Sequence, residues 1–255
     1  MNFRERPNTE TKKELPVVNL SEGIETGVIK NLSFDMFKLA RNLKERALTY
    51  DTIVSDDASG RLVSLFIKKV FDGLRKKQNQ PPMQIRFIAS GRFISENKRE
   101  GIKGFLEKNK DKFGKVLLVT EYIETGQSIN EIVNILNALQ IDFDLAALTI
   151  SRQVVESLLR KWGLKGGFFF GGESQGRSYL SGGVKLHGQK GLSGITKNVE
   201  DSNPFPERFK TTIKSEYPED NKVVQQERQI VQQTVNRTRK DIDLLAKKTI
   251  ELLEK

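Results

Sequence analysis

The sequence predicts an α/β protein with a doubly wound parallel sheet, a Gly-rich basic region and a long C-terminal helix. Three observations lead to this prediction. Short β-prone runs alternate with amphipathic helical patterns between residues 51 and 162. Residues 163–194 hold eleven of the twenty glycines. Residues 219–255 carry apolar side chains at the alternate 4/3 spacing of a helical seam.

The first third of the chain is predicted to open with a polar arm over residues 1–30, which are weakly patterned. Ser33 is predicted to cap a helix, because the following residues FDMFKLARNLKERAL place apolar side chains on one face. The elements expected next are a strand over 51–55, a turn-rich loop DDASG, a helix over Arg61–Lys76 and a strand over 85–89.

The middle of the chain continues the alternation. Residues 90–115 are polar and basic, with a short helix expected at 103–109. Val116–Val119 is a continuous apolar run, typical of a strand that is buried on both faces. The expected elements that follow are a helix over 129–139, a strand over 145–150 and a helix over 152–162. The core domain is therefore predicted to span residues 31–162.

Residues 163–203 are predicted to form a separate Gly-rich basic region with short irregular strands. Phe168–Phe170 within it are expected to be buried in a core rather than to stack on a base. Pro204 and Pro206 mark a linker, so residues 204–255 comprise a linker and a helical extension. The seam of that helix predicts either a coiled coil that joins two copies of the chain or a helix docked on the core.

The composition excludes several classes of site. The chain has no Cys and one His, His187, which excludes a disulfide framework, a Cys-based zinc site and a His cluster. No apolar run is long enough to span a bilayer, and the N-terminus lacks an apolar signal core. We therefore expect a cytoplasmic protein with no membrane partner.

The net charge of +10 comes from two segments. Residues 97–115 hold seven cations against three acids, and residues 160–197 hold seven against one. A locally basic surface suits a polyanion, which could be a phosphorylated small molecule or a nucleic acid. The sequence offers no recognised nucleic-acid motif there, so nucleic acid ranks last among the expected partners.

The strongest chemical signal is the segment Val116–Ser128, VLLVTEYIETGQS. Ligands of open α/β sheets bind beyond the carboxyl ends of the strands, and Glu121 and Glu124 follow this strand. Gly126 permits a tight turn, and exposed N–H groups with the hydroxyls of Thr125 and Ser128 can cradle a phosphate. A carboxylate beside that phosphate must serve sugar hydroxyls, the water shell of a metal or a proton transfer.

This segment resembles the signature of type I phosphoribosyltransferases, in which four apolar residues precede two acids, two apolar residues and a Thr-Gly-x-Thr/Ser loop. Of the acid pair only the second is present, because Thr120 precedes Glu121. The resemblance implies that Glu121 holds the ribose hydroxyls of phosphoribosyl pyrophosphate and that Glu124 acts as a base. The residues implied for the 5′-phosphate are Thr125, Gly126, Gln127 and Ser128.

The same resemblance implies further contacts. A pyrophosphate loop would comprise Asp57, Ser59, Gly60 and Arg61. A mobile lid would carry Arg92, Lys98, Arg99 and Lys103. Residues 163–200 would form the hood that selects the acceptor, and Mg²⁺ would bridge pyrophosphate and ribose with Glu121 as an indirect ligand. Asp56 and Asp57 are unusual beside pyrophosphate unless a divalent cation lies between.

Two functions stay open on this reading. The first is a pentosyltransferase that moves phosphoribose to a nucleobase-like acceptor and releases pyrophosphate. The second is a non-catalytic sensor of phosphoribosyl pyrophosphate or a nucleotide, with the C-terminal helix as its output or dimerisation element. Thr120 favours the sensor, whereas Glu124 and the basic lid favour the enzyme.

Overall fold

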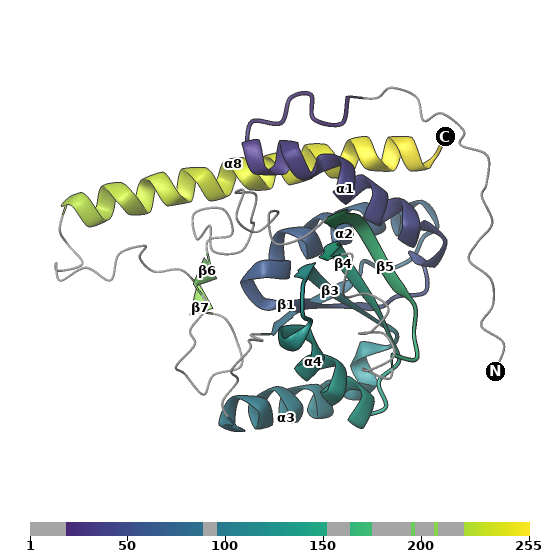
Figure 1. The fold of residues 1–255 in the computed structure, drawn as a ribbon. Helices are drawn as coiled ribbons and strands as arrows, with labels where there is room; N and C mark the ends of the chain where they lie inside the picture. Colours follow the sequence, from purple (N-terminus) through teal and green to yellow (C-terminus); the bar gives the residue numbers. More distant parts are fainter. Residues whose placement is uncertain (1–18, 89–95, 152–163, 175–194, 197–206, 209–221) are drawn as a thin grey trace.

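The main sheet of the chain is parallel and has five strands in the order β2-β1-β3-β4-β5 (Figure 1). The computed structural model describes residues 19–88, 96–151, 164–174, 195–196, 207–208 and 222–255. The strands are β1 (Thr52–Asp56), β2 (Gln84–Ile88), β3 (Val116–Ile123), β4 (Phe143–Ser151) and β5 (Phe168–Ser174). The predicted parallel α/β fold is confirmed.

Helices cover both faces of this sheet. One face carries α1 (Gly27–Leu43), followed by the short helix η1 (Lys44–Arg46), and α2 (Asp57–Lys77). The other carries α3 (Glu96–Phe113) and α4 (Gln127–Ala138). From β1 the chain crosses to β2 on one side and later returns past β1 to β3, and right-handed crossovers therefore put α2 and α3 on opposite faces. A small antiparallel pair, β6 (Ile195–Thr196) and β7 (Glu207–Arg208), lies apart.

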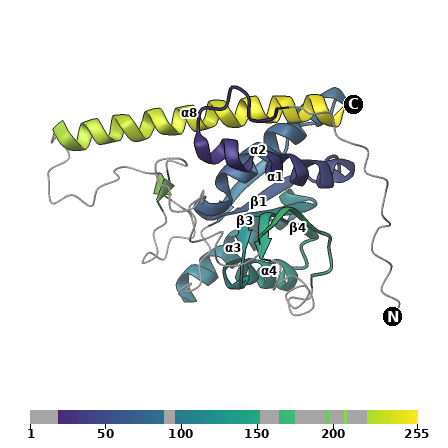
Figure 2. The same cartoon turned by 45° about the horizontal axis from the view of Figure 1, so that its top comes forward.

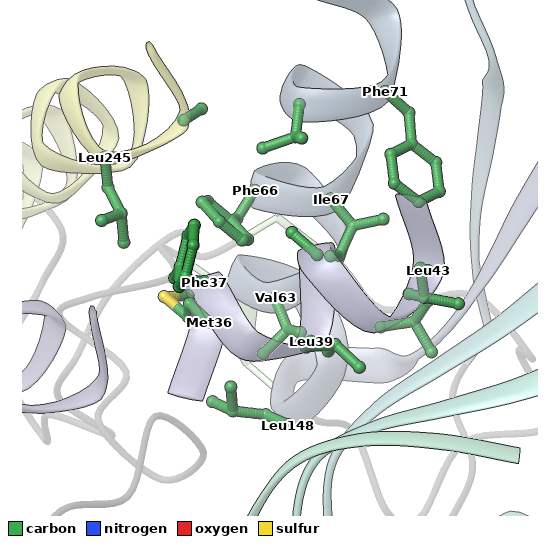
Figure 3. Close-up of a cluster of buried hydrophobic side chains, with 14 of the residues drawn as sticks. Met36, Phe37, Leu39, Leu43, Val63, Phe66, Ile67, Phe71, Leu148 and Leu245 are labelled. Carbon is green, nitrogen blue, oxygen red and sulfur yellow. The ribbon is translucent and has the colours of Figure 1, made fainter. Parts of the chain in front are cut away.

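The two faces of β3 contribute to two hydrophobic cores. Leu117 and Val119 pack with α1 and α2, whereas Val116 and Leu118 pack with α3 and α4. Figure 3 shows the first core, in which Phe66 of α2 lies beside Phe37 of α1. The continuous apolar run of β3 is therefore explained by burial on both sides.

Three predicted element boundaries are wrong. Ser33 is not a helix cap, since α1 begins at Gly27 and the Ser33 hydroxyl donates to the Lys30 carbonyl inside the helix. The predicted DDASG loop is absent as a loop, because β1 ends at Asp56 and α2 begins at Asp57. The short helix expected at 103–109 is part of the 18-residue α3.

The predicted start of the Gly-rich region also differs from the structure. Phe168–Ser174 forms β5, which pairs in parallel with β4, so the core continues beyond residue 162. Phe169 packs on the first core and Phe168 and Phe170 on the second, which confirms that these rings serve packing. The helix expected at 152–162, residues 175–194 and the Pro204–Pro206 linker lie outside the described residues.

The C-terminal helix α8 (Lys222–Leu253) lies across α1 and α2 (Figures 1 and 2). From Val235 onward its seam is buried, with Ile242 and Leu245 in the first core. Of the two alternatives, this half of the seam is thus a helix docked on its own core. The earlier half carries Ile230, which is 61% exposed, and self-association through it stays a prediction.

Residues 19–26 of the predicted arm are held by α8. The buried carboxylate of Asp241 accepts hydrogen bonds from the backbone N–H groups of Glu25 (3.2 Å) and Thr26 (2.7 Å), immediately before α1. Lys248 donates to the carbonyls of Asn19 and Glu22. Asp241 therefore fixes the chain immediately before α1, from 215 residues further along the sequence.

We expect Asp241→Ala to lower the free energy of unfolding by about 1–2 kcal/mol, because the N–H groups of Glu25 and Thr26 lose their acceptor. Urea unfolding followed by circular dichroism measures this. Asp243→Asn is the control, since Asp243 lies on the same helix with 56% of its side chain exposed. Equal stability of the two variants would contradict the role of Asp241 in holding the segment before α1.

The amino end of the sheet holds a buried carboxylate, Asp144 of β4. It accepts hydrogen bonds from the Tyr50 hydroxyl (2.6 Å), Arg46 Nη1 (2.9 Å) and the Gly167 N–H (2.5 Å). Burial alone would raise the pKa of Asp144, but these donors and the charge of Lys115 outweigh burial and hold it below its ordinary value. This network ties the start of β4 to the segments before β1 and β5.

Within the described residues, none of the helices combines the length and apolar character needed to cross a bilayer.

Candidate functional site

The strand order places a topological switch point between β1 and β3. The chain leaves β1 toward β2 on one side and leaves β3 toward β4 on the other. At such a point the connections that follow the two strands diverge, which opens a crevice at their carboxyl ends where ligands of α/β proteins bind. The two predicted phosphate-binding segments, Asp57–Arg61 and Glu124–Ser128, follow these two strands.

The loop between β3 and α4 leads into the start of a helix through a glycine. Gly126 is the N-cap of α4 and has a φ of 69°, a left-handed conformation that favours glycine. Its carbonyl accepts the first helical hydrogen bond, from Asn130, and as a glycine it has no side chain with which to cap the helix. Acidic residues are absent from the first turn of α4. The N–H groups at the start of a helix can bind an anion.

The residues predicted around this loop differ in exposure. Thr125 is exposed and Glu124 is half-buried, so both can reach a ligand at the surface. Gln127 and Ser128 begin α4, and their side chains lie outside the described set. The backbone therefore brings the predicted phosphate residues to one helix end.

Glu121 lies deeper than the sequence indicates. The strand was expected to end at Val119, but β3 continues to Ile123, so Glu121 is inside the strand and 4% exposed. Thr120, which stands where the resemblance implies an acid, is 2% exposed. Both residues make polar or electrostatic contacts within the structure.

The junction of β1 and α2 is packed directly on β3. A Cβ atom on Gly60 would come within 2.7 Å of the Val119 carbonyl oxygen and 2.9 Å of Ser55 Oγ. Only a residue without a side chain lets the first turn of α2 lie this close to β3. The start of α2 therefore lies directly against Val119 and Thr120 of β3, the strand that leads to the second predicted segment, and Gly60 makes this close packing possible.

The other predicted residues of this junction have separate environments. Arg61 holds its guanidinium 3.7 Å from the centre of the Phe87 ring on β2, a cation–π contact. The side chains of Asp57 and Ser59, in the first turn of α2, lie outside the described set. Arg61 is thus placed over the end of β2, on the side of β1 that faces away from β3.

Sequence reasoning missed three small polar side chains near the carboxyl ends of the strands. Ser55 on β1 and Thr149 and Ser151 on β4 are at most 5% exposed. Ser55 Oγ is buried and, among the described residues, has no hydrogen-bond partner. The only local signal is a hydroxyl inside otherwise apolar runs, TIVS and LTIS. Strand register is needed to place Ser55 beside Val119 and Thr149 beside Tyr122.

The predicted lid residues occupy a helix on the second face of the sheet. Lys98 of α3 is 4% exposed, and Arg99 Nε lies 3.1 Å from Glu131 Oε2 of α4. Lys103 is exposed, and Arg92 lies outside the described residues. Their role as a lid stays a prediction.

The acidic residues near the candidate site suit Mg²⁺ only if a bound phosphate compound supplies most of the metal's ligands. No group of three or more His, Cys, Asp or Glu side chains in the described ranges is arranged to hold a metal ion. Mg²⁺ takes one or two carboxylates together with phosphate oxygens and water. The carboxylates of Glu121 and Glu124 at this edge fit that mode, in which the substrate supplies most ligands.

No protein-family model matches the sequence, and no curated protein matches it. The solved structures that are similar to the chain include the following two. An orotate phosphoribosyltransferase from Aeropyrum pernix is 12% identical, with 60% of this chain and 75% of that protein covered and a TM-score of 0.34. A hypoxanthine-guanine phosphoribosyltransferase from Schistosoma mansoni is 16% identical, with 56% and 64% covered and a TM-score of 0.35.

Proposed function

We propose that the chain binds the ribose 5-phosphate part of phosphoribosyl pyrophosphate or of a nucleoside monophosphate at the carboxyl ends of β1 and β3. We further propose that it transfers phosphoribose to a nucleobase-like acceptor with release of pyrophosphate. The observation that carries the proposal is the uncapped start of α4 at Gly126, beside the exposed Thr125 and at the switch point of the sheet.

Each residue has a part in this proposal. The N–H groups at the start of α4 and the Thr125 hydroxyl bind the 5′-phosphate. Glu121 accepts hydrogen bonds from the ribose hydroxyls, and Glu124 takes a proton from the acceptor. Mg²⁺ that arrives with pyrophosphate would supply positive charge to the leaving group and reach Glu121 through water. The transition state is close to an oxocarbenium ion, so the protein need only orient the sugar, bind the leaving group and exclude water.

The phosphate site is tested by calorimetric titration with ribose 5-phosphate, and with phosphoribosyl pyrophosphate plus Mg²⁺. The Thr125→Ala, Ser128→Ala double variant removes two hydroxyl donors to a charged group, so we expect the Kd to rise at least on the order of 100-fold. Thr49→Ala is the matched control, since Thr49 is exposed and precedes β1 at the other edge of the sheet. An unchanged Kd in the double variant would remove the phosphate site.

The alternative is a non-catalytic sensor. Thr120 in place of the first acid of the pair favours it, because one carboxylate fewer is available to hold the ribose. A screen of nucleobases for pyrophosphate release from phosphoribosyl pyrophosphate separates the two. Release with any acceptor supports the enzyme, whereas tight binding with no release across the screen supports the sensor.

A further inference from the structure

Asp35 lies on α1 where this helix crosses β5. A Cβ atom on Gly171 would stand 2.1 Å from the Asp35 main-chain oxygen, and one on Gly172 would stand 2.6 Å from Oδ1 and 2.9 Å from Oδ2. Two successive glycines therefore let the helix rest on the strand backbone. Asn42, two turns later on α1, fixes this contact with a 2.9 Å hydrogen bond to the Phe170 carbonyl. Both carboxylate oxygens of Asp35 are held against the strand.

The Asp35 carboxylate is shielded without being paired. It is half-buried, yet among the described residues it accepts no hydrogen bond and forms no ion pair. Burial raises its pKa, and the charge of Lys38 on the same helix offsets this only in part. Other shielded carboxylates in the described chain do accept hydrogen bonds, namely Asp72, Asp144 and Asp241.

Packing alone does not account for this residue. An alanine at the same position would fill the helix–strand contact without the cost of desolvating a carboxylate. A polar group that is shielded, unpaired and still reached by solvent is a candidate for ligand recognition.

The position of Asp35 is at the ligand-binding edge of the sheet. Gly172 is paired with Thr149, two residues before the end of β4, and β5 ends at Ser174. β5 is two strands from β3, which is about 10 Å at the usual spacing between strands. Figure 1 shows α1 running over the end of β5. A ligand whose phosphate lies at Gly126 can extend along this edge to Asp35.

We propose that Asp35 is a specificity-determining residue of a second subsite, which takes a planar ligand group with two adjacent N–H donors. Amidines, guanidines and amino-substituted heterocycles carry such an edge. An ionised carboxylate only accepts hydrogen bonds, and its two oxygens match two parallel N–H groups. The inference rests on the proposed function, because the phosphate loop is taken to hold the other end of the ligand.

The test compares ligands that differ by one donor. Guanosine monophosphate presents two adjacent N–H donors and inosine monophosphate presents one, while ribose 5-phosphate reports the phosphate loop alone. We expect the wild type to bind guanosine monophosphate at least about 10-fold tighter than inosine monophosphate. Asp35→Asn should bring this ratio close to one and leave the Kd of ribose 5-phosphate unchanged. Glu45→Gln, which removes an exposed carboxylate just after α1, should keep the wild-type ratio.

Thermal unfolding adds a readout that needs no ligand. A recognition carboxylate held without a partner destabilises the free protein, so Asp35→Asn should raise the Tm relative to Glu45→Gln. A lower Tm would identify Asp35 as a structural acceptor and overturn the proposal.

The outcomes separate this subsite from the phosphate site. If ribose 5-phosphate binds but the wild type shows no preference, or Asp35→Asn keeps it, the subsite is wrong and the phosphate site stands. Guanosine and inosine, which have no phosphate, are titrated in parallel. If ribose 5-phosphate fails to bind, the proposed function falls, and a guanosine preference that depends on Asp35 would still support the subsite. If ribose 5-phosphate fails to bind and guanosine also shows no preference that depends on Asp35, the subsite is overturned together with the proposed function.

Discussion

Asp144→Ala should lower the free energy of unfolding by about 3–5 kcal/mol, the range found when one partner of a buried charged network is removed. The side chain of Asp144 is 1% exposed and accepts hydrogen bonds from Tyr50, Arg46 and the Gly167 N–H. Its loss leaves the buried Tyr50 hydroxyl without its acceptor at the start of the sheet. Urea unfolding at neutral pH measures the change.

A neighbouring carboxylate provides the control. Lys115 Nζ lies 3.7 Å from both Asp142 and Asp144, but the side chain of Asp142 is 71% exposed. We expect Asp142→Asn to change the stability by less than about 0.5 kcal/mol, since an exposed pair contributes little. Similar losses in both variants would show that the Lys115 contact, rather than the buried network, carries the effect.

Acid should reduce the difference between the wild type and Asp144→Ala. The pKa of Asp144 is below the ordinary carboxyl value of 3.8 in the folded chain and close to it in the unfolded chain. The stability from this group is therefore fully present above that ordinary value and is lost as the pH falls through the folded pKa. A difference that stays constant as the pH falls below 3.8 would contradict the role of the ionised carboxylate.

Local patterns predict the parallel core because β-prone runs and amphipathic helices alternate clearly from β1 to β4. They fail where the decisive contact is distant in sequence. Ser33 resembles a helix cap, but α1 begins at Gly27, and the chain before it is held by Asp241 on α8. Gly171 and Gly172 resemble a turn, but they lie within β5, where the absence of side chains lets α1 pack against the strand.

The candidate site is likewise predictable from the sequence only in part. The proposed phosphate loop at Gly126 can be predicted because one strand-to-helix segment contains all its parts. The buried hydroxyl of Ser55 and the carboxylate of Asp35 reach the same edge from other elements. Their alignment depends on strand register and helix packing, which short-range spacing does not contain.

Gly60→Ala should weaken both stability and ligand binding, although alanine favours helices by about 1 kcal/mol over glycine. The new Cβ atom would come within 2.7 Å of the Val119 carbonyl oxygen and 3.4 Å of Thr120 Cα, and strand backbone cannot move aside cheaply. We expect overpacking to outweigh helix propensity, with a net loss of about 1–3 kcal/mol. Displacement of α2 from β3 should also raise the Kd of ribose 5-phosphate about 10-fold or more.

Gly104→Ala on α3 is the matched control with the opposite expected sign. Gly104 is an exposed helical glycine, and a Cβ atom there would meet nothing within 4 Å. Helix propensity then acts alone, so this variant should gain up to about 1 kcal/mol and bind ribose 5-phosphate as the wild type does. Urea unfolding measures the stability of both variants, and calorimetry measures their Kd for ribose 5-phosphate. If Gly60→Ala gains stability as Gly104→Ala does, α2 can move away from β3 freely, and the close junction does not position the site.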